Sequence, residues 1–337
     1  MYKNILIIFF SFFCQAYYLF GPGSIMQLIN NIDNFKIKYK NPVITIGNFD
    51  GVHLGHQALL HEVIEKAEEL NGTSMVMTFE PHPTRVLKPD YYLPLITLYE
   101  QKVELIEKSG IDVLVCLPFN RKFASITADD FIDNLLLETI AIKAIVVGKD
   151  YSFGKNREGN ISLLKKHASQ KGFEVIVSNW IPVSGNCPVR ISSTKIRELV
   201  LDGKVEEVPQ LLGRFYQIRG MVVPGRNRGG RLLGCPTANI NLKDELCPKR
   251  GVYAVIVECL NCKYKGVANI GYSPTFTDQQ FTVEVHILNF NKDIYEHQIR
   301  VNFITRIRDE KKFSNINELA EQIKKDIKKA DAILPDP

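Results

Sequence analysis

Two histidines three positions apart, His53 and His56, are the residues of this sequence best suited to phosphate chemistry. They lie in GNFDGVHLGHQ, residues 47–57, where an apolar stretch typical of a strand gives way to a helical pattern. Gly51 and Gly55 let the backbone turn tightly and bring N–H groups and the positive end of a helix toward an anion. Each imidazole can donate a hydrogen bond to an α-phosphate that gains charge in a transition state. The alternative is that both are surface residues or helix caps, because short motifs often match by chance.

The elements that must position these histidines follow from the pattern around them. Short β-branched stretches alternate with amphipathic helical patterns between residues 42 and 179, which predicts a parallel sheet with helices on both faces. Strands are expected at 43–46, 74–79, 112–116, 144–147 and 174–177. Such sheets bind ligands beyond the carboxyl ends of their strands, where the HxGH step and the TFEPHP segment (78–83) both fall.

The pattern changes after Leu212. Strand-like stretches there are separated by turns rich in Gly, Asn, Asp and Pro, without helical patterns between them, which predicts an antiparallel barrel or sandwich. These strands are expected at 216–223, 251–258, 264–269, 282–288 and 298–303. An amphipathic helix beginning near Ser314 is expected to close the barrel with its apolar stripe.

Length and composition are those of a two-domain globular protein of 337 residues. A net charge of +5 suits anionic small molecules and does not demand nucleic acid. Seven scattered cysteines favour a reducing compartment over a disulfide framework, so we expect a cytoplasmic protein. Cys259 and Cys262 form a CxxC without a second pair, so a turn is favoured there over a zinc or redox site.

Residues 1–25 have a different character from the rest of the chain. An apolar, aromatic-rich stretch follows Lys3 and resembles a signal peptide or a short membrane anchor. It is short for a membrane span. We expect this extension to be a mis-assigned start or dispensable, with a soluble protein from Met26 onward and no membrane association for residues 26–337.

Taken in order, these motifs resemble those of the bacterial bifunctional riboflavin kinase/FAD synthetases. The resemblance runs from about Met26 to Ala332 and includes GNFDGVHLGHQ, TFEPHP, VGKD, RISSTKIR, LGCPTAN and VEVH. It implies a Rossmann-like nucleotidyltransferase α/β domain at 26–205, which adenylylates FMN. It also implies a riboflavin kinase domain at 206–337, built as an antiparallel β-barrel with a terminal helix.

For the first domain, the resemblance implies that His53 and His56 act on the α-phosphate of ATP. It also gives ATP or phosphate contacts to Gly47, Phe49, Gly51, Gly55, Arg190, Ser193, Thr194 and Arg197. Ser-Ser-Thr at 192–194 could equally be only a helix cap, although capping and phosphate binding are compatible. Asp150 would orient the flavin substrate or a metal, or be a simple turn residue. Phe119 and Phe123 would belong to a flavin loop or to the core.

For the second domain, the resemblance assigns Glu284 as the base, and Thr237 and Asn239 as magnesium or phosphate contacts. Gly225, Arg231 and Gly234 would lie along the ATP phosphates. Because Glu284 faces away from its strand neighbours Val283 and Val285, it can point into a barrel mouth. The alternative for Glu284 is a solvated outward charge.

Several residues depart from the family pattern. Tyr151-Ser152 stands where Phe-Arg is usual, so a cation that could assist flavin or phosphate binding is missing. Pro224, Cys235 and Ser273 replace His, Phe and Arg, respectively, in the second domain. None of these changes removes a residue expected to be catalytic.

The sequence therefore predicts phosphorylation of riboflavin to FMN and adenylylation of FMN to FAD, with ATP as co-substrate and Mg²⁺ in both steps. The expected partners are riboflavin, FMN and ATP, without nucleic acid. One alternative is a riboflavin kinase whose adenylyltransferase domain is inactive. Another is a flavin- or RNA-binding regulatory protein, suggested by the basic residues Arg226, Arg228 and Arg231. Transfer to a different phosphorylated substrate would leave the second domain unexplained.

Overall fold

The computed structural model describes residues 26–30, 32, 35, 38–179, 191–224, 236–242, 244–272 and 281–336. The extension at 1–25 lies outside the described residues. So do four predicted phosphate contacts, namely Arg190, Gly225, Arg231 and Gly234.

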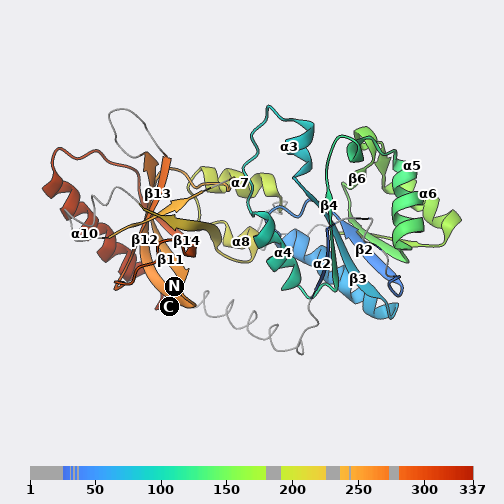
Figure 1. The fold of residues 1–337 in the computed structure, drawn as a ribbon, viewed down its shortest axis with the longest axis horizontal. Coiled ribbons are helices and arrows are strands. Elements are labelled where there is room, and N and C mark those ends of the chain that lie inside the picture. The colour runs from blue at the N-terminus through green and yellow to red at the C-terminus, as the bar shows by residue number, and fades with distance from the viewer. Residues whose placement is uncertain are drawn as a thin grey trace. The chain divides into compact units, whose positions relative to one another are not determined.

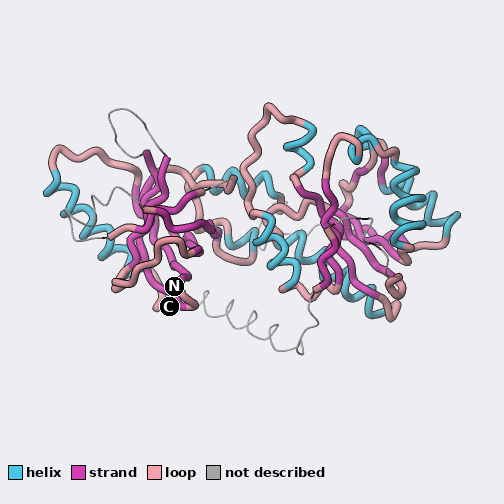
Figure 2. The backbone as a smooth tube through the Cα atoms, in the orientation of Figure 1, coloured by secondary structure: helices cyan, strands magenta, loops and turns pink. Residues whose placement is uncertain are grey.

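The chain divides into two compact units (Figure 2). The first unit comprises the described residues among Met1–Phe49, His56–Tyr92 and Tyr99–Trp180. The second contains the described residues among Ile181–Pro337 together with two short segments, Asp50–Gly55 and Leu93–Leu98. Our boundary between residues 205 and 206 stays a prediction, because units of packing and units of function need not coincide.

A parallel six-stranded sheet forms the centre of the first unit (Figure 1), which confirms the predicted α/β architecture. Its strand order is β1-β4-β3-β2-β5-β8, and every neighbouring pair runs parallel. The strands are β1 (Gln27–Ile29), β2 (Pro42–Ile46), β3 (Thr73–Glu80), β4 (Val113–Pro118), β5 (Ala144–Gly148) and β8 (Glu174–Ser178). A small hairpin joins β6 (Ser152–Phe153) to β7 (Gly159–Asn160).

Both faces of this sheet are covered, which is why its strands read as continuous apolar runs. All five residues of β2 are buried. Ile44 and Ile46 pack in one core with side chains of η3 (Phe131–Ile140) and α6 (Ile161–Lys171), while α2 (Leu54–Glu69) and α4 (Tyr99–Glu107) lie on the opposite face (Figure 1). The other helical segments of this unit are α3 (Pro83–Leu87), η2 (Phe123–Ser125), α5 (Ala128–Asp130) and η4 (Lys155–Arg157).

The second unit contains a closed antiparallel barrel of six strands in the order β10-β13-β12-β11-β14-β9. Tyr216, Tyr253 and Phe303 are the largest side chains of its interior, and both tyrosine rings contact the Phe303 ring. The strands are β9 (Tyr216–Val223), β10 (Ala238–Asn241), β11 (Gly251–Cys259), β12 (Cys262–Tyr272), β13 (Phe281–Ile287) and β14 (Gln298–Arg308). Two helices precede them, α7 (Ser193–Leu201) and α8 (Pro209–Leu212).

The C-terminal helix α10 (Ile316–Ile333) is present as predicted, with Asn315 as its N-cap. It does not close the barrel, because hydrogen-bonded strands already complete the ring. Instead, Ala330 and the adjoining Leu334 pack on the outward-facing side chains of β11, such as Val252 and Ala254. The expectation that its apolar stripe seals the barrel was therefore wrong.

Candidate active sites

The HxGH segment leaves β2 through strained backbone. Gly51 has a φ of 88°, while the non-glycine residues Phe49 and Val52 have φ values of 48° and 37°. Both of these side chains are buried. Such conformations cost about 1–3 kcal/mol each and persist only where surrounding contacts impose them. Contacts with segments distant in sequence must therefore hold this turn.

Asp50 is the centre of those contacts. Its Oδ1 accepts hydrogen bonds from the backbone N–H groups of Ile96 (3.0 Å) and Thr97 (3.1 Å), and Gly51 N–H donates to Thr97 Oγ1 at 3.0 Å. The other carboxylate oxygen pairs with the guanidinium of Arg197. This buried carboxylate is thus satisfied by backbone donors and a cation, and it fixes residues 50–51 against two segments distant in sequence.

Helix α7 supplies the predicted serine and arginine of this cluster. Ser192 is its N-cap and accepts from Lys195 N–H, which confirms the capping interpretation. Ser193 Oγ donates to Asp50 O at 2.9 Å. Arg197 also donates to Pro94 O at 3.0 Å, so its charge is engaged with protein groups. Exposed Thr194 lies in the first turn of the same helix, where backbone N–H groups can meet an anion.

The two histidines have different surroundings. His53 is only 6% exposed, and burial, together with the nearby charge of Arg214, lowers its pKa to about 4. It is therefore neutral at pH 7 and retains one N–H donor. His56 is half-buried at the start of α2, with its ring edge-on to Phe49 at 5.1 Å between centroids.

The glycines of the segment leave room for these rings. A Cβ at Gly47 would lie 3.3 Å from the Phe49 ring, and one at Gly55 would lie 3.2 Å from the His53 ring. Contacts this short would force the aromatic rings to shift. Both glycines therefore preserve the ring positions, whatever they do for a phosphate.

The predicted flavin residues Phe119 and Phe123 belong to an aromatic cluster beside the carboxyl ends of β3 and β4. Their rings contact each other at 5.7 Å and both contact Phe79, at 5.6 and 5.5 Å. Both are half-buried, so they serve the core and keep part of their surface accessible. Asp150 is exposed in the turn after β5.

Tyr151 points inward at the position where the family usually has phenylalanine. It stacks on Phe153 with 5.5 Å between ring centroids, and burial raises the pKa of its hydroxyl. The neighbouring Ser152 accepts a hydrogen bond from Arg157 Nε at 2.8 Å. A guanidinium thus approaches the serine that replaces the usual arginine.

In the barrel, Glu284 stands in a row of polar residues across three strands. It is paired in register with Asn239 of β10 on one side and Asn269 of β12 on the other. Its neighbours Val283 and Val285 face the buried interior, so Glu284 lies on the outer face of the strand rather than inside the barrel. It is half-buried there, and burial raises the pKa of its carboxyl. The expectation that Glu284 points into the barrel mouth was therefore wrong, and its partial burial also separates it from a fully solvated charge.

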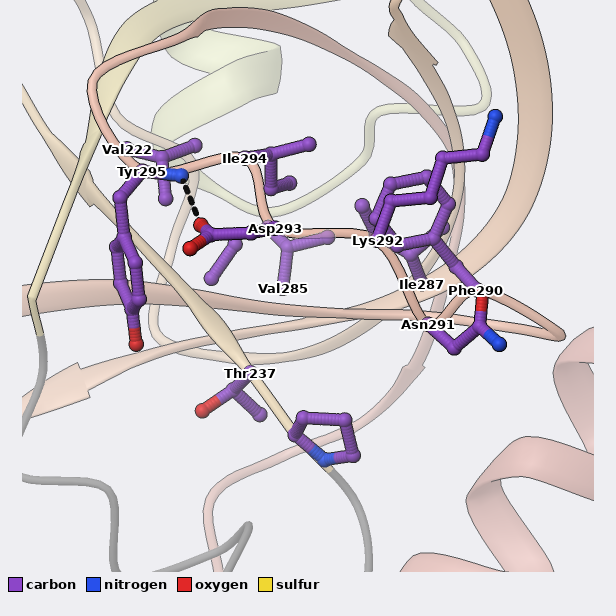
Figure 3. A pocket seen from close by; sticks show the side chains of 12 residues that line it. Val222, Thr237, Val285, Ile287, Phe290, Asn291, Lys292, Asp293, Ile294 and Tyr295 are labelled. Carbon is purple, nitrogen blue, oxygen red and sulfur yellow. Dashed lines mark hydrogen bonds between the residues drawn. The ribbon is translucent and has the colours of Figure 1, made fainter.

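A pocket of about 300 Å³ lies at one end of the barrel (Figure 3). Its apolar wall includes Val285 and Phe290, and its polar groups include Thr237, Asp293 and Lys292. Asp293 accepts from the backbone N–H of Tyr295 at 2.9 Å. The complete lining is Val222, Pro236, Thr237, Ala238, Val285, Ile287, Phe290, Asn291, Lys292, Asp293, Ile294 and Tyr295. Thr237 is thus the predicted site residue that reaches this pocket, whereas Asn239 and Glu284 are not part of its lining.

Comparisons with known proteins agree with both halves of this description. The FAD synthetase family model matches residues 36–195, and the riboflavin kinase family model matches residues 212–334. A bifunctional riboflavin kinase/FMN adenylyltransferase of Buchnera aphidicola subsp. Schizaphis graminum is 41% identical over 305 residues, covering 90% of this chain and 97% of the relative. The protein of the same description in Escherichia coli K12 is 39% identical, covering 89% and 96%, respectively.

This chain belongs to the bifunctional riboflavin kinase/FMN adenylyltransferase family. It therefore carries two activities, phosphorylation of riboflavin to FMN and adenylylation of FMN to FAD. Both reactions use ATP, as the sequence predicted.

A solved structure also shares this two-domain fold. It is described as a macrolide-efflux protein from Streptococcus pneumoniae, and it is 34% identical, with a TM-score of 0.81, over 90% of this chain and 98% of that one. Among the described residues of the flavin enzyme, no helix is long and apolar enough to cross a membrane.

Sequence reasoning missed three residues of this flavin enzyme. Asp50 lies within GNFDGVHLGHQ but was not assigned a role. The Nδ1 atom of His286 lies 2.9 Å from the carbonyl oxygen of Pro236, which lines the pocket. Lys102 is buried, and its Nζ lies 3.3 Å from Thr78 Oγ1. The burial of Lys102 could have been predicted from the sequence, because Lys102 precedes buried Ile106 by one helical turn and so shares the buried face of α4.

Proposed function

We propose that adenylyl transfer depends on the HxGH segment and the start of α7. The phosphate of FMN attacks the α-phosphorus of ATP, pyrophosphate leaves, and the protein contributes positioning and charge stabilisation. His53 and His56 donate hydrogen bonds to the α-phosphate oxygens. The neutral state of His53 supports this role, because a neutral imidazole still offers one N–H donor.

Ser193 and Thr194 contribute N–H groups from the first turn of α7 to the same phosphates. Arg197 acts chiefly through its pair with Asp50, which fixes the turn, and its contact with the leaving pyrophosphate stays a prediction. Flavin binding by Phe119, Phe123 and Asp150 is likewise proposed. The accessible edges of the two phenylalanines suit stacking on an isoalloxazine ring.

Riboflavin phosphorylation is proposed to use Glu284 as general base. The carboxylate takes the proton of the primary hydroxyl of riboflavin. The hydroxyl oxygen attacks the γ-phosphorus of ATP, and ADP leaves. The observation that carries this assignment is the half-buried position of Glu284 between Asn239 and Asn269, where burial raises its pKa toward working pH. A base whose pKa lies nearer the working pH takes a proton more effectively.

The pocket at the barrel end is the proposed ATP site of the kinase reaction. Its apolar wall can hold a base, and Lys292 can meet phosphate oxygens. Thr237 offers a hydroxyl and Asn239 an amide oxygen, and such oxygen ligands suit Mg²⁺ that is bound mainly through substrate phosphates. The metal would supply charge neutralisation when bound. Cytoplasmic localisation and the lack of a nucleic-acid partner stay predictions.

A time course with riboflavin, ATP and Mg²⁺, in which FMN and FAD are separated chromatographically, tests both assignments. The wild-type protein should accumulate FMN and then convert it to FAD. FMN without FAD would instead support a kinase with an inactive adenylyltransferase domain, and flavin or RNA binding without turnover would support a regulatory role.

Crossed variants then assign the residues. His56→Ala should lower FAD formation from FMN by roughly 100-fold or more and spare FMN formation, whereas Glu284→Gln should do the reverse. Loss of both activities in a folded variant would contradict the two-site assignment.

A further inference from the structure

Arg214 lies in the short connection between α8 and β9, outside the motifs on which the family resemblance was based. The residue is half-buried, and its guanidinium is desolvated enough that its pKa falls to about 10. Arg219 contributes to this lowering by charge repulsion. A cation in such surroundings is unfavourable unless its N–H groups find acceptors.

The acceptors are backbone carbonyls of the HxGH turn. Arg214 Nη2 donates to Gly51 O at 2.6 Å, and Nη1 lies 3.3 Å from both Val52 O and Leu212 O. Within the part of the chain that the structure describes, all hydrogen bonds recorded for this guanidinium go to carbonyl oxygens. The arginine is thus used to hold backbone rather than to neutralise a carboxylate.

These two carbonyls belong to the two peptide units that precede His53 in the chain. The Val52 carbonyl is part of the peptide unit that contains His53 N, and Gly51 and Val52 both have positive φ. If the two carbonyls were released, the strained turn could relax and rotate that peptide. Arg214 and the Asp50–Arg197 pair therefore hold opposite chemical features of one turn, namely its carbonyl oxygens and its carboxylate.

We infer that Arg214 is a positioning residue for adenylyl transfer, which holds the Gly51 and Val52 carbonyls and thereby places His53 against the α-phosphate. This inference rests on the proposed role of His53. Arg214, which lies just before the barrel strand β9, would thus serve adenylyl transfer, the reaction assigned to the HxGH segment.

The variant Arg214→Met removes the guanidinium but keeps much of the aliphatic part of the side chain. A displacement of the HxGH turn should lower kcat for FAD formation by roughly 10- to 100-fold, with a much smaller change in KM for ATP. Arg214→Lys should lose less, because one ammonium can still reach one carbonyl. FMN formation by the same samples reports the amount of folded protein. Arg250→Met is the matched control, because Arg250 belongs to the same unit and its side chain is 58% exposed.

The outcomes are distinguishable. A selective fall in kcat for FAD formation, with FMN formation and the Arg250→Met control unchanged, supports the inference. An equal loss of both activities would mean that Arg214 is only structural, and unchanged FAD formation would mean that it does not position the turn. Either result would overturn the inference. A wild-type protein that makes no FAD, or a His53→Ala variant with full FAD formation, would instead refute the proposed function.

Discussion

At the residue scale, the protonation of His53 depends strongly on its surroundings. An imidazole with its ordinary pKa would be partly protonated near pH 6.5, but burial and the charge of Arg214 lower the pKa of His53 to about 4. Desolvation is the larger cause. The ring therefore keeps a single, fixed N–H donor throughout the physiological pH range.

This shift predicts a specific loss of stability in acid. Between pH 6.5 and about 4 the unfolded chain binds a proton at His53 that the folded protein does not, so stability falls as the pH falls. At pH 5 the loss amounts to about 2 kcal/mol relative to neutral pH. Urea unfolding of the wild type and His53→Gln at pH 7.5 and 5 measures it. The difference between the two proteins should shrink or reverse on acidification; an unchanged difference would contradict the lowered pKa.

Residue identities explain which site features the sequence could predict. His53 was predicted from its spacing in the HxGH step, Ser193 from its place at a helix start, and Glu284 from the family resemblance, and their roles stay predictions. The role of Asp50 could not be found this way, because its partners Thr97 and Arg197 are far away in sequence and depend on tertiary packing. A buried carboxylate is recognisable only when its donors are known.

At the element scale, the predicted strands were largely confirmed because each has a strong β-branched pattern. The missed strands were β1 and β10, which have three and four residues, and the two-residue strands β6 and β7. In β10, Asn239 and Asn241 give little strand propensity, and the strand exists because β9 and β13 pair with it on both sides. Its discovery matters for function, because it places Asn239 beside Glu284.

Helix α10 gives a prediction at the same scale. Asp326 is buried where an apolar residue would be expected, and it accepts hydrogen bonds from Arg308 of β14, the shortest at 2.7 Å. Asp326→Ala would leave that guanidinium without its carboxylate partner and should destabilise the second unit by roughly 3–5 kcal/mol. The FMN-forming activity that remains at rising temperature or urea concentration measures this loss of stability.

The control for this prediction is Asp331→Ala on the same helix. The Asp331 side chain is 62% exposed and pairs with Lys265 at 3.2 Å, so its removal should change the free energy of unfolding by less than about 1 kcal/mol. Equal effects of the two substitutions would mean that the buried pair does not anchor α10.

At the scale of the whole molecule, one chain combines two reactions that share ATP, a co-substrate with several negative charges. Its modest positive charge of +5 is compatible with such substrates. The parallel sheet and the closed barrel each have a core of their own. Damage to one reaction therefore need not abolish the other.

Removal of divalent metal should affect both reactions. With excess EDTA, FMN formation and FAD formation should each fall by roughly 100-fold or more, because several kcal/mol of charge stabilisation are lost. Both should return when Mg²⁺ is restored above the chelator concentration. Either product forming at its full rate from metal-free ATP would contradict the proposed Mg²⁺ requirement for that reaction.

The hydrogen bond from Arg214 to Gly51 also has a consequence for biosynthesis. It joins residues 163 positions apart. At about 5–20 residues per second, a ribosome needs roughly 10 to 30 s to add that length of chain. Until then the nascent sheet can form and Asp50 can find its partners, but the Gly51 and Val52 carbonyls of the HxGH turn lack Arg214. The growing polypeptide should therefore gain adenylyltransferase competence late, after Arg214 has left the ribosomal exit tunnel.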